Sequence, residues 1–281
     1  MRSDVRCDKF GGMKFELGVV GAGNMAEAIV QGVLGSNQLR AEQIVAADVS
    51  EARRKLFVDM GVRAVADAAE FAGGCRHLLL SVKPQQMGSA LAALAPRLSA
   101  ETLVISIAAG ISSQFIERSL GERAKWRVIR SMPNTPMLVG EGMVAISAGA
   151  HATAEDLSAA RKLFESAATV VEVPENLIDA VTAVSGSGPA YVFYLVEQMI
   201  AAGVSLGLSP QTAHLLATRT ALGAAKMLVN SSDSPAELRR KVTSPHGTTA
   251  AAIAVMDQAK LPAIVGEAIR AAERRGKEMG Q

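Results

Sequence analysis

The chain has 281 residues, of which 49% are hydrophobic, enough for one large domain or two ordinary ones with sizeable cores. Its 29 Lys and Arg residues nearly balance its 27 Asp and Glu residues, and only 4% of residues are aromatic, which argues against a protein that binds nucleic acid. Two distant cysteines, Cys7 and Cys75, argue against a disulfide framework or a bound metal such as zinc, and predict a reducing cytoplasmic location.

The N-terminal segment, residues 1–13, mixes charges with glycines and contains no apolar stretch of the kind found in signal peptides. We expect it to be a disordered extension that precedes the fold. The longest uncharged stretches, Ala180–Val196 and Gln198–Thr218, are interrupted by Gly, Pro and Ser, whereas a membrane-spanning helix needs about 20 continuous apolar residues. We therefore expect no membrane segment and interpret these stretches as helices buried on most sides, as in a tight dimer.

Short apolar runs alternate with amphipathic stretches through the first part of the chain. The runs predicted to be buried strands are Phe15–Val20, Ile44–Ala47, His77–Val82, Leu103–Ile107, Arg127–Arg130, Met143–Ala148 and Thr169–Val173. The segments predicted to be helices are Met25–Leu34, Glu51–Met60, Gln85–Ala95, Ser112–Leu120 and Ala154–Ala168, with N-caps at Ser50, Ser112 and Thr153. Strands that alternate with helices at this spacing predict a parallel, doubly wound sheet, which is an α/β, Rossmann-like fold.

The character of the sequence changes after Pro174. From Glu175 onward no segment has the pattern of a strand, and Ala- and Leu-rich helical stretches are broken at SGSGP, GLSP, SSDSP and TSPHG. We therefore predict two domains: an α/β domain over residues 14–173 and an all-helical domain over residues 174–281.

The segment Val20–Ala26, V-G-A-G-N-M-A, follows the first predicted strand and opens the first predicted helix. In this context Gly21 permits a tight turn, Gly23 lets the backbone approach a pyrophosphate, and Ala26 replaces the third glycine where close packing is needed. The second strand is followed by Asp48, roughly 20 residues downstream, where an acid binds the adenosine ribose. The α/β domain is therefore predicted to bind a dinucleotide, with the remaining motif residues Ala22, Asn24 and Met25 at the same turn.

Asp48 also bears on the choice of cofactor. A carboxylate accepts hydrogen bonds from a ribose 2′-hydroxyl and repels a 2′-phosphate, so Asp48 favours NADH. Arg53 and Arg54 follow in the next helix and could clamp a phosphate, but we interpret them as solvated charges. NADH is the preferred prediction, and NADPH stays open.

Four further segments are too specific for a generic dinucleotide-binding fold: Ser81–Gln85 (SVKPQ), Arg130–Pro136 (RSMPNTP), Ser185–Tyr191 (SGSGPAY) and Val242–Thr249 (VTSPHGTT). With the glycine motif, their order and spacing resemble the pyrroline-5-carboxylate reductase family over nearly the whole chain from Phe15 onward. The resemblance implies hydride transfer from NADH or NADPH to the C=N bond of a small cyclic imino acid, which yields L-proline in the last step of proline biosynthesis. It also implies an obligate homodimer formed by the helical domain, and rings of dimers occur among such relatives.

By this resemblance several residues line the cofactor cleft. They follow two neighbouring strands and comprise Ser81, Val82, Lys83 and Pro84 in the first loop and Ala108 and Ala109 in the second. The small residues of the second loop would let the nicotinamide lie flat. Asn134 either orients the carboxamide or ribose of the cofactor, or has a structural role between two prolines.

The resemblance places the substrate in the helical domain. The loop with Ser244, Gly247, Thr248 and Thr249 would hold the carboxylate at a helix N-terminus, and plain helix capping by Ser and Thr is the alternative. Thr182 matches a threonine that faces the imine nitrogen, so it is the predicted catalytic residue. Glu175 matches an acidic residue of the same pocket, with a cap or surface role as its alternative.

Three positions depart from the family pattern. His246 stands where Gly is usual, and it would cost roughly 1–2 kcal/mol if the backbone there is left-handed. Arg219 replaces a common Gln, and Ala68 replaces a common Asn. Two other functions stay open: a 3-hydroxyacid-type dehydrogenase with Lys226 as the acid, and a catalytically silent NAD(H)-binding protein, to which only His246 points.

Overall fold

The computed structural model describes residues 14–279, so the predicted extension over residues 1–13 lies outside the described residues. The described chain divides into two units with dense internal contacts. The first runs to Gly186 and also includes the C-terminal residues from Ala272 onward, and the second is Ser187–Ala271. Each unit is described below by itself.

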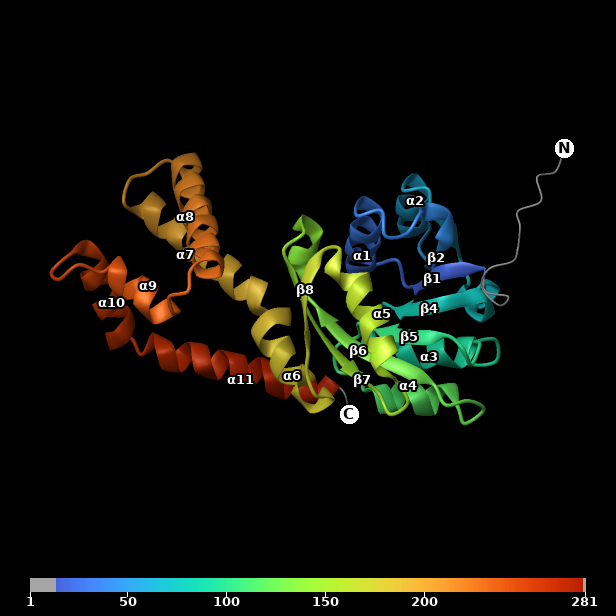
Figure 1. Cartoon of the computed structure of the whole chain (residues 1–281). Coiled ribbons are helices and arrows are strands. Elements are labelled where there is room, and N and C mark those ends of the chain that lie inside the picture. The colour runs from blue at the N-terminus through green and yellow to red at the C-terminus, as the bar shows by residue number, and fades with distance from the viewer. Residues whose placement is uncertain (1–13, 280–281) are drawn as a thin grey trace. The chain divides into compact units, whose positions relative to one another are not determined.

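The first unit is built on one eight-stranded sheet with the order β3-β2-β1-β4-β5-β6-β7-β8 (Figure 1). Its strands are β1 (Phe15–Val20), β2 (Ile44–Ala47), β3 (Arg63–Val65), β4 (Cys75–Leu80), β5 (Leu103–Ser106), β6 (Arg127–Pro133), β7 (Gly142–Ala148) and β8 (Ala168–Glu172). All neighbouring strands pair in parallel except β6 and β7, which are antiparallel. The Rossmann-like sheet is confirmed, but the prediction of a wholly parallel sheet is wrong at this pair.

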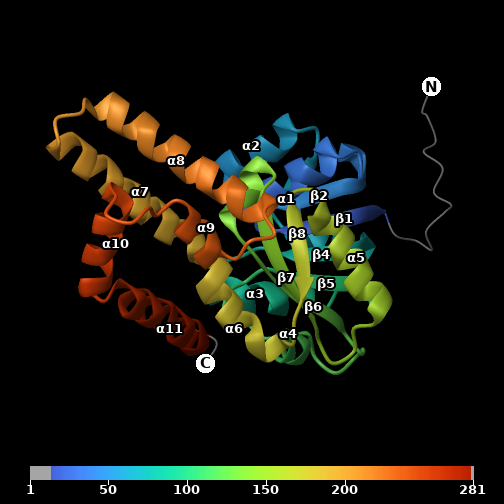
Figure 2. The same ribbon diagram turned by 60° about the vertical axis from the view of Figure 1, so that its left-hand side comes forward.

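Helices cover both faces of the sheet (Figure 2). One core lies under α1 (Asn24–Gly35), α2 (Glu51–Asp59) and α5 (Ala154–Glu165), and the other lies under α3 (Pro84–Leu94) and α4 (Ser113–Leu120). Successive strand residues point to opposite faces, so Val19 enters the first core and Val20 the second. Because both faces are buried, most residues of the central strands are apolar, which is why the sequence revealed them.

The three predicted N-caps are confirmed. The side chains of Ser50 and Ser112 accept hydrogen bonds from the backbone N–H groups of Arg53 and Phe115. Thr153 forms a capping box with Asp156 at the start of α5. These caps satisfy N–H groups that have no partner within the helix, and so they fix where each helix begins.

The segment after β8 belongs to the first unit, although the sequence placed a domain boundary after Val173. It contains a 3₁₀ turn at Glu175–Leu177, the short helix α6 (Ile178–Val181) and a π-helical turn at Thr182–Gly186. Polar contacts to the sheet and to α4 hold this segment, which is why the first unit extends to Gly186.

The second unit is helical, and residues 175–279 contain no strand, as predicted. Its helices are α7 (Gly188–Ser205), α8 (Pro210–Asn230), α9 (Pro235–Lys241) and α10 (Thr248–Gln258), followed by α11 (Leu261–Met279), whose last residues belong to the first unit. The helices α7, α8 and α9 end at predicted breaks, whereas the break between α10 and α11, at Ala259 and Lys260, was not predicted. Helices α7 and α8 run side by side (Figure 1, Figure 2), and the Cα of Gly203 faces Ala213 closely enough that a Cβ would lie 3.2 Å from the alanine Cβ.

Candidate cofactor and substrate site

The glycine turn lies at the carboxyl end of β1, where the strand order reverses between β1 and β4. The N–H of Gly21 donates to the carbonyl of Ala47 at the end of β2, and the N–H of Ser81 donates to the carbonyl of Val20, both at 2.8 Å. The loops after β1, β2 and β4 therefore meet at one edge of the sheet. Open α/β sheets bind nucleotides at this type of switch point.

The two glycines of the turn have different tasks. Gly21 has φ +93°, and a Cβ there would lie 2.7 Å from the carbonyl oxygen of Ser81, so only glycine fits. A Cβ at Gly23 would meet nothing within 4 Å, and no side chain caps the helix that Gly23 begins. Ala26 is fully buried, as its packing role requires. Gly23 thus leaves the first N–H groups of α1 accessible, which fits a pyrophosphate.

Asp48 is hydrogen-bonded to the glycine turn itself. Its Oδ2 accepts from the N–H of Ala22 at 2.7 Å, and its Oδ1 accepts from the N–H of Ser50 at 2.8 Å. The carboxylate therefore joins the loops after β1 and β2. Each oxygen keeps a further lone pair, so a half-buried Asp48 still has acceptor capacity for a ribose hydroxyl.

Arg53 and Arg54 lie against this turn, so their interpretation as solvated charges is wrong. Arg53 forms an ion pair with Glu27 at 2.7 Å and donates from Nε to the carbonyl of Ala22. Arg54 donates from Nη1 to the carbonyls of Asp48 and Val49 at 2.8 and 2.9 Å. Both guanidinium groups thus help to hold the loops that follow β1 and β2.

The other predicted cofactor residues reach the same edge. Ser81 and Val82 are half-buried beside Gly21, and exposed Lys83 precedes Pro84, which begins α3. The loop after β5 is bonded to β4 through the N–H of Ile107 and the carbonyl of Leu80. The two small residues of that loop, Ala108 and Ala109, are buried and half-buried, and Asn24 and Met25 form the first turn of α1.

Both polar atoms of the Asn134 side-chain amide form hydrogen bonds within the first unit. Its Nδ2 donates to the carbonyl of Ser185 at 3.1 Å, and its Oδ1 accepts from the N–H of Met143 at 2.8 Å. The residue is buried at the carboxyl end of β6. This geometry favours the structural alternative over a role in orienting the cofactor.

Glu175 and Thr182 lie in the segment that follows β8. Both carboxylate oxygens of Glu175 bond to Ser113, one to its N–H at 2.7 Å and one to its hydroxyl at 2.5 Å. Glu175 therefore matches the capping alternative and holds the start of α4. Thr182 begins the π-helical turn, and its hydroxyl donates to the carbonyl of Ile178 at 2.8 Å, which leaves the lone pairs of the oxygen available.

The loop with Ser244 and Gly247 lies in the second unit. The N–H of Gly247 donates to the carbonyl of Ser244 at 3.1 Å, and α10 starts with Thr248 and Thr249. No side chain caps this helix, so the alternative of plain capping by Ser and Thr is wrong. His246 has φ +59°, which confirms that the position where the family carries Gly is left-handed.

Comparison with known proteins covers both halves of the chain. A family model described as pyrroline-5-carboxylate reductase dimerisation matches residues 175–279, and one described as NADP oxidoreductase, coenzyme F420-dependent, matches residues 16–110. A pyrroline-5-carboxylate reductase of Synechocystis sp. is 43% identical over 96% of this chain and 100% of its own length. One of Pseudomonas aeruginosa is 43% identical over 93% of this chain and 96% of its own length. The chain belongs to the pyrroline-5-carboxylate reductase family.

Solved structures agree with this family assignment. A Plasmodium falciparum pyrroline carboxylate reductase with NADP bound has a TM-score of 0.86 at 30% identity, over 96% of this chain and 100% of that one. A prephenate dehydrogenase of A. aeolicus, at 16% identity and a TM-score of 0.52, shows only that the fold is shared. The family assignment favours the reductase over the hydroxyacid dehydrogenase that would use Lys226, which is exposed on α8.

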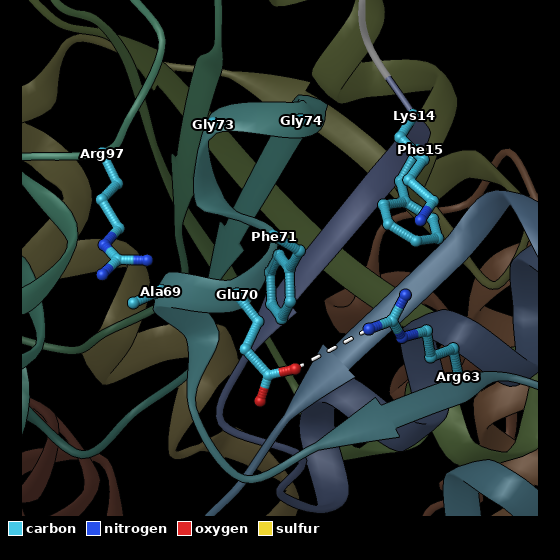
Figure 3. Close-up of a pocket in the computed structure, with 9 residues that line it drawn as sticks. All are labelled: Lys14, Phe15, Arg63, Ala69, Glu70, Phe71, Gly73, Gly74 and Arg97. Carbon is cyan, nitrogen blue, oxygen red and sulfur yellow. Dashed lines mark ion pairs between the residues drawn. The ribbon is translucent and has the colours of Figure 1, made fainter. Parts of the chain in front are cut away.

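A cavity of about 390 Å³ lies at the other end of β1 (Figure 3). Its walls include Lys14 and Phe15 at the amino end of that strand, and Arg63, which forms an ion pair with Glu70 at 3.7 Å. The candidate cofactor residues follow the carboxyl ends of the strands, and none of them lines this cavity. It is therefore separate from the cofactor edge.

Sequence reasoning missed a charged cluster in the first unit. Arg130 of β6 is buried and forms ion pairs with Glu175 and Asp179. The signal was the position of Arg130, directly after the apolar Val128 and Ile129 within a strand predicted to be buried, because a buried cation needs a partner. The described residues hold no group of His, Cys, Asp and Glu that could bind a metal ion. Burial raises the pKa of the Cys75 thiol to about 12, which does not favour a reactive thiolate. No helix in the described part of the chain could span a membrane.

Proposed function

We propose that this chain is an oxidoreductase that reduces 1-pyrroline-5-carboxylate to L-proline, the last step of proline biosynthesis. The observation that carries the proposal is its similarity, over nearly the full length, to proteins named pyrroline-5-carboxylate reductase. When bound, the reduced nicotinamide supplies the hydride. The residues of the chain bind and orient the two reactants, and holding them in reacting geometry can contribute about 7–11 kcal/mol to lowering the barrier.

The cofactor is held at the edge where the loops after β1, β2, β4 and β5 meet. The open N–H groups from Gly23 to Met25 bind the pyrophosphate, and Asp48 accepts a hydrogen bond from the adenosine ribose. The loop Ser81–Pro84 forms one wall. Ala108 and Ala109 provide a small surface against which a flat ring can lie.

NADH is the preferred cofactor in this proposal. Asp48 would repel a 2′-phosphate, while the guanidinium of Arg53 is engaged by Glu27 and the carbonyl of Ala22. Asp48→Asn removes the charge and keeps an acceptor. We expect this variant to shift the ratio of kcat/KM for NADH over NADPH towards NADPH by about tenfold, which corresponds to about 1.4 kcal/mol. An unchanged ratio would show that Asp48 does not select the cofactor.

The substrate carboxylate binds at the N-terminus of α10. Its first N–H groups are not taken by any capping side chain, and the partial positive charge of the helix end favours an anion. Ser244, Thr248 and Thr249 add hydroxyl groups, and the Ser244 hydroxyl oxygen lies 2.5 Å from where a Cβ on Gly247 would stand, so glycine lets Ser244 lie against the start of the helix. This assignment places the carboxylate site in the second unit, Ser187–Ala271.

Thr182 binds the ring nitrogen. A protonated imine is a stronger electrophile than a neutral one, so a group that stabilises the N–H⁺ assists hydride transfer. The Thr182 hydroxyl donates to the carbonyl of Ile178, so its oxygen is available to accept from that N–H⁺. In this arrangement Thr182 holds the proton on the nitrogen.

The deciding assay mixes the purified protein with 1-pyrroline-5-carboxylate and NADH or NADPH and follows the loss of reduced-nicotinamide absorbance. Thr182→Ala should lower kcat by roughly 10-fold to 10⁴-fold. Thr218→Ala is the matched control, because the Thr218 hydroxyl also donates to a carbonyl four residues earlier, at 2.8 Å, on α8. Equal turnover by both variants would remove Thr182 from the mechanism, and an inactive unmodified protein would refute the proposed function.

The active form is an obligate homodimer made by the second unit. Large apolar side chains of α7 and α8, among them Phe193, Tyr194 and Leu216, are exposed in the single chain, and the matching family model describes dimerisation. Large apolar surfaces that become buried between two subunits are typical of obligate interfaces. A ring of dimers and a cytoplasmic location stay predictions.

A further inference from the structure

One face of β6 contacts the segment that carries Thr182. Arg130, Met132 and Asn134 alternate along the chain, so their side chains point to the same face of the sheet. Each contacts residues 175–186: Arg130 meets Glu175 and Asp179, Met132 meets Gly186, and Asn134 meets Ser185. Arg130, Met132 and Asn134 therefore form a continuous stripe of contacts along β6 and the residue that follows it.

Arg130 is the charged member of this stripe. The side chain is 7% exposed, its Nη2 lies 3.0 Å from Oδ1 of Asp179, and its Nη1 lies 3.6 Å from Oε1 of Glu175. Its Nε is buried without a hydrogen-bond partner, so the two carboxylates are what compensates the buried cation. If either ion pair were lost, the buried guanidinium of Arg130 would be less well compensated. The position of residues 175–186 therefore depends on Arg130.

The two carboxylates extend the network in different directions. Glu175 bonds to the N–H and hydroxyl of Ser113 at the start of α4. Asp179 lies on α6, one turn before the π-helical turn. Arg130 therefore connects β6, the start of α4 and the helix that leads into Thr182–Gly186.

The remaining two members hold the π-helical turn itself. A Cβ at Gly186 would lie 2.7 Å from Cε of Met132, so the methionine packs directly on the glycine backbone. Nδ2 of Asn134 donates to the carbonyl of Ser185 at 3.1 Å. π-helical turns are rare and occur often at functional sites. In this chain the turn has specific support from β6 at Ser185 and Gly186, and from Arg130 through α6.

We propose that Arg130 and Asn134 are positioning residues that act through the π-helical turn: they hold Thr182 where its oxygen meets the substrate nitrogen. This inference rests on the proposed role of Thr182. Neither residue needs to touch the substrate or the cofactor. The expected signature is a fall in kcat while the KM for NADH stays constant.

Arg130→Lys is the first test, because a lysine keeps the charge but its single ammonium cannot reproduce the planar contact with two carboxylates. We expect kcat with 1-pyrroline-5-carboxylate to fall at least tenfold and the KM for NADH to change less than twofold. Arg127→Lys is the matched control on the same strand. Arg127 points to the opposite face and forms an ion pair with Asp156 at 2.9 Å, so its loss should affect stability and leave kcat within twofold.

Asn134→Asp is the second variant, which keeps the test decisive if Arg130→Lys fails to fold. The aspartate keeps an acceptor for the N–H of Met143 but cannot donate to the carbonyl of Ser185. We again expect a fall in kcat of at least tenfold with an unchanged KM for NADH. A rise in the KM for NADH with constant kcat would overturn the proposal for Asn134 and assign it to cofactor binding.

A double-mutant cycle with Thr182→Ala separates a positioning role from a general structural one. If Arg130 acts through Thr182, Arg130→Lys should lower kcat less than twofold when Thr182 is already alanine. The same tenfold fall in both backgrounds would overturn the inference. Failure of the proposed function looks different, because the unmodified protein would then not oxidise NADH with 1-pyrroline-5-carboxylate, or Thr182→Ala alone would have no effect.

Discussion

The two units of the chain differ in where their apolar side chains lie. In the first unit both faces of the sheet are covered, and residues such as Leu17, Leu79 and Ile105 are almost completely buried. In the second unit the only buried apolar residues among those described are Ala213 and Ala217. Its large apolar side chains are exposed, and these include Tyr191, Phe193, Tyr194, Leu195, Leu215, Leu216, Leu222, Met227, Leu228, Ile264 and Val265.

This difference separates two ways of obtaining a stable core. The first unit buries its apolar surface within one chain, so we expect its proposed cofactor edge to need no partner. The second unit leaves most of its large apolar side chains exposed, and extensive exposed apolar surface is typical of an interface. The comparison predicts that changes in the second unit act through assembly, whereas changes in the first unit act on its own fold.

The largest expected effect comes from a charge on the exposed apolar surface of α7. Phe193→Asp would place a carboxylate in the dimer interface, where burial of an unpaired charge costs several kcal/mol. We expect the dimer to dissociate and kcat/KM for 1-pyrroline-5-carboxylate to fall more than 100-fold. Sedimentation equilibrium together with the nicotinamide assay measures both effects.

Val139→Asp provides the control for that experiment. Val139 is 76% exposed and Phe193 is 67% exposed, but Val139 lies in the first unit, after β6. The comparison predicts that this variant remains dimeric and active. Dissociation of the Val139 variant, or a dimeric Phe193 variant, would contradict the division between the units.

The next effect separates the two glycines of the first unit. Gly21→Ala combines a positive φ with a Cβ 2.7 Å from a carbonyl oxygen, so we expect a loss of roughly 2–4 kcal/mol in the free energy of unfolding. Gly23→Ala meets no atom within 4 Å, so it should fold normally and raise the Kd of NADH at least tenfold. Urea unfolding and NADH fluorescence titration distinguish the two, and equal stability of both variants would show that Gly21 is not structurally required.

A smaller effect is expected at the left-handed His246 of the second unit. His246→Gly removes the cost of a side chain at φ +59° but adds freedom to the unfolded chain, so the net gain in unfolding free energy is roughly 0.5–1 kcal/mol. Unfolding must be compared at one protein concentration, because the stability of a dimer depends on concentration. A less stable glycine variant would indicate that the imidazole makes a favourable contact in the dimer.

The last prediction concerns the pH dependence of stability and His77 on β4. Burial is the main cause that lowers its pKa from 6.5, and its Nδ1 lies 3.1 Å from the carbonyl of Glu16. A lowered pKa means that the unfolded chain takes up the proton first, so stability should fall as the pH drops below about 6.5. The slope contributed is at most about 1.4 kcal/mol per pH unit. His77→Gln should flatten the dependence of the urea midpoint on pH, and an unchanged slope would assign it to other groups.

Much of the first unit could be predicted because its strands are buried on both faces. Phe15–Val20 and Ile44–Ala47 match β1 and β2 in full, since each is a mostly apolar run followed by turn residues. The strand β3, Arg63–Val65, was missed because it is only three residues long, lies at the edge of the sheet and begins with a charge. The antiparallel pair β6–β7 did leave a signal, because the connection Asn134–Glu141 is too short for a parallel crossover.

The cofactor residues of the site could be predicted from the sequence, whereas the network around Arg130 could not, and the reason is physical. The glycine turn and Asp48 form a local motif, so their positions follow from spacing along the chain. The network around Arg130 joins residues that are distant in sequence, and its partner Asp179 stands in a segment with no motif. The π-helical turn also has no apolar periodicity of its own, so SGSGP was interpreted as a break between helices and as part of a family motif, but not as a π-helical turn.

Measuring NADH affinity and turnover on the same Phe193→Asp monomer tests the central claim most directly. The first unit carries the cofactor edge by itself, so the Kd of NADH should stay within threefold of the unmodified value while turnover of 1-pyrroline-5-carboxylate is lost. Loss of NADH binding together with turnover would contradict this account, and so would a monomer that keeps full activity.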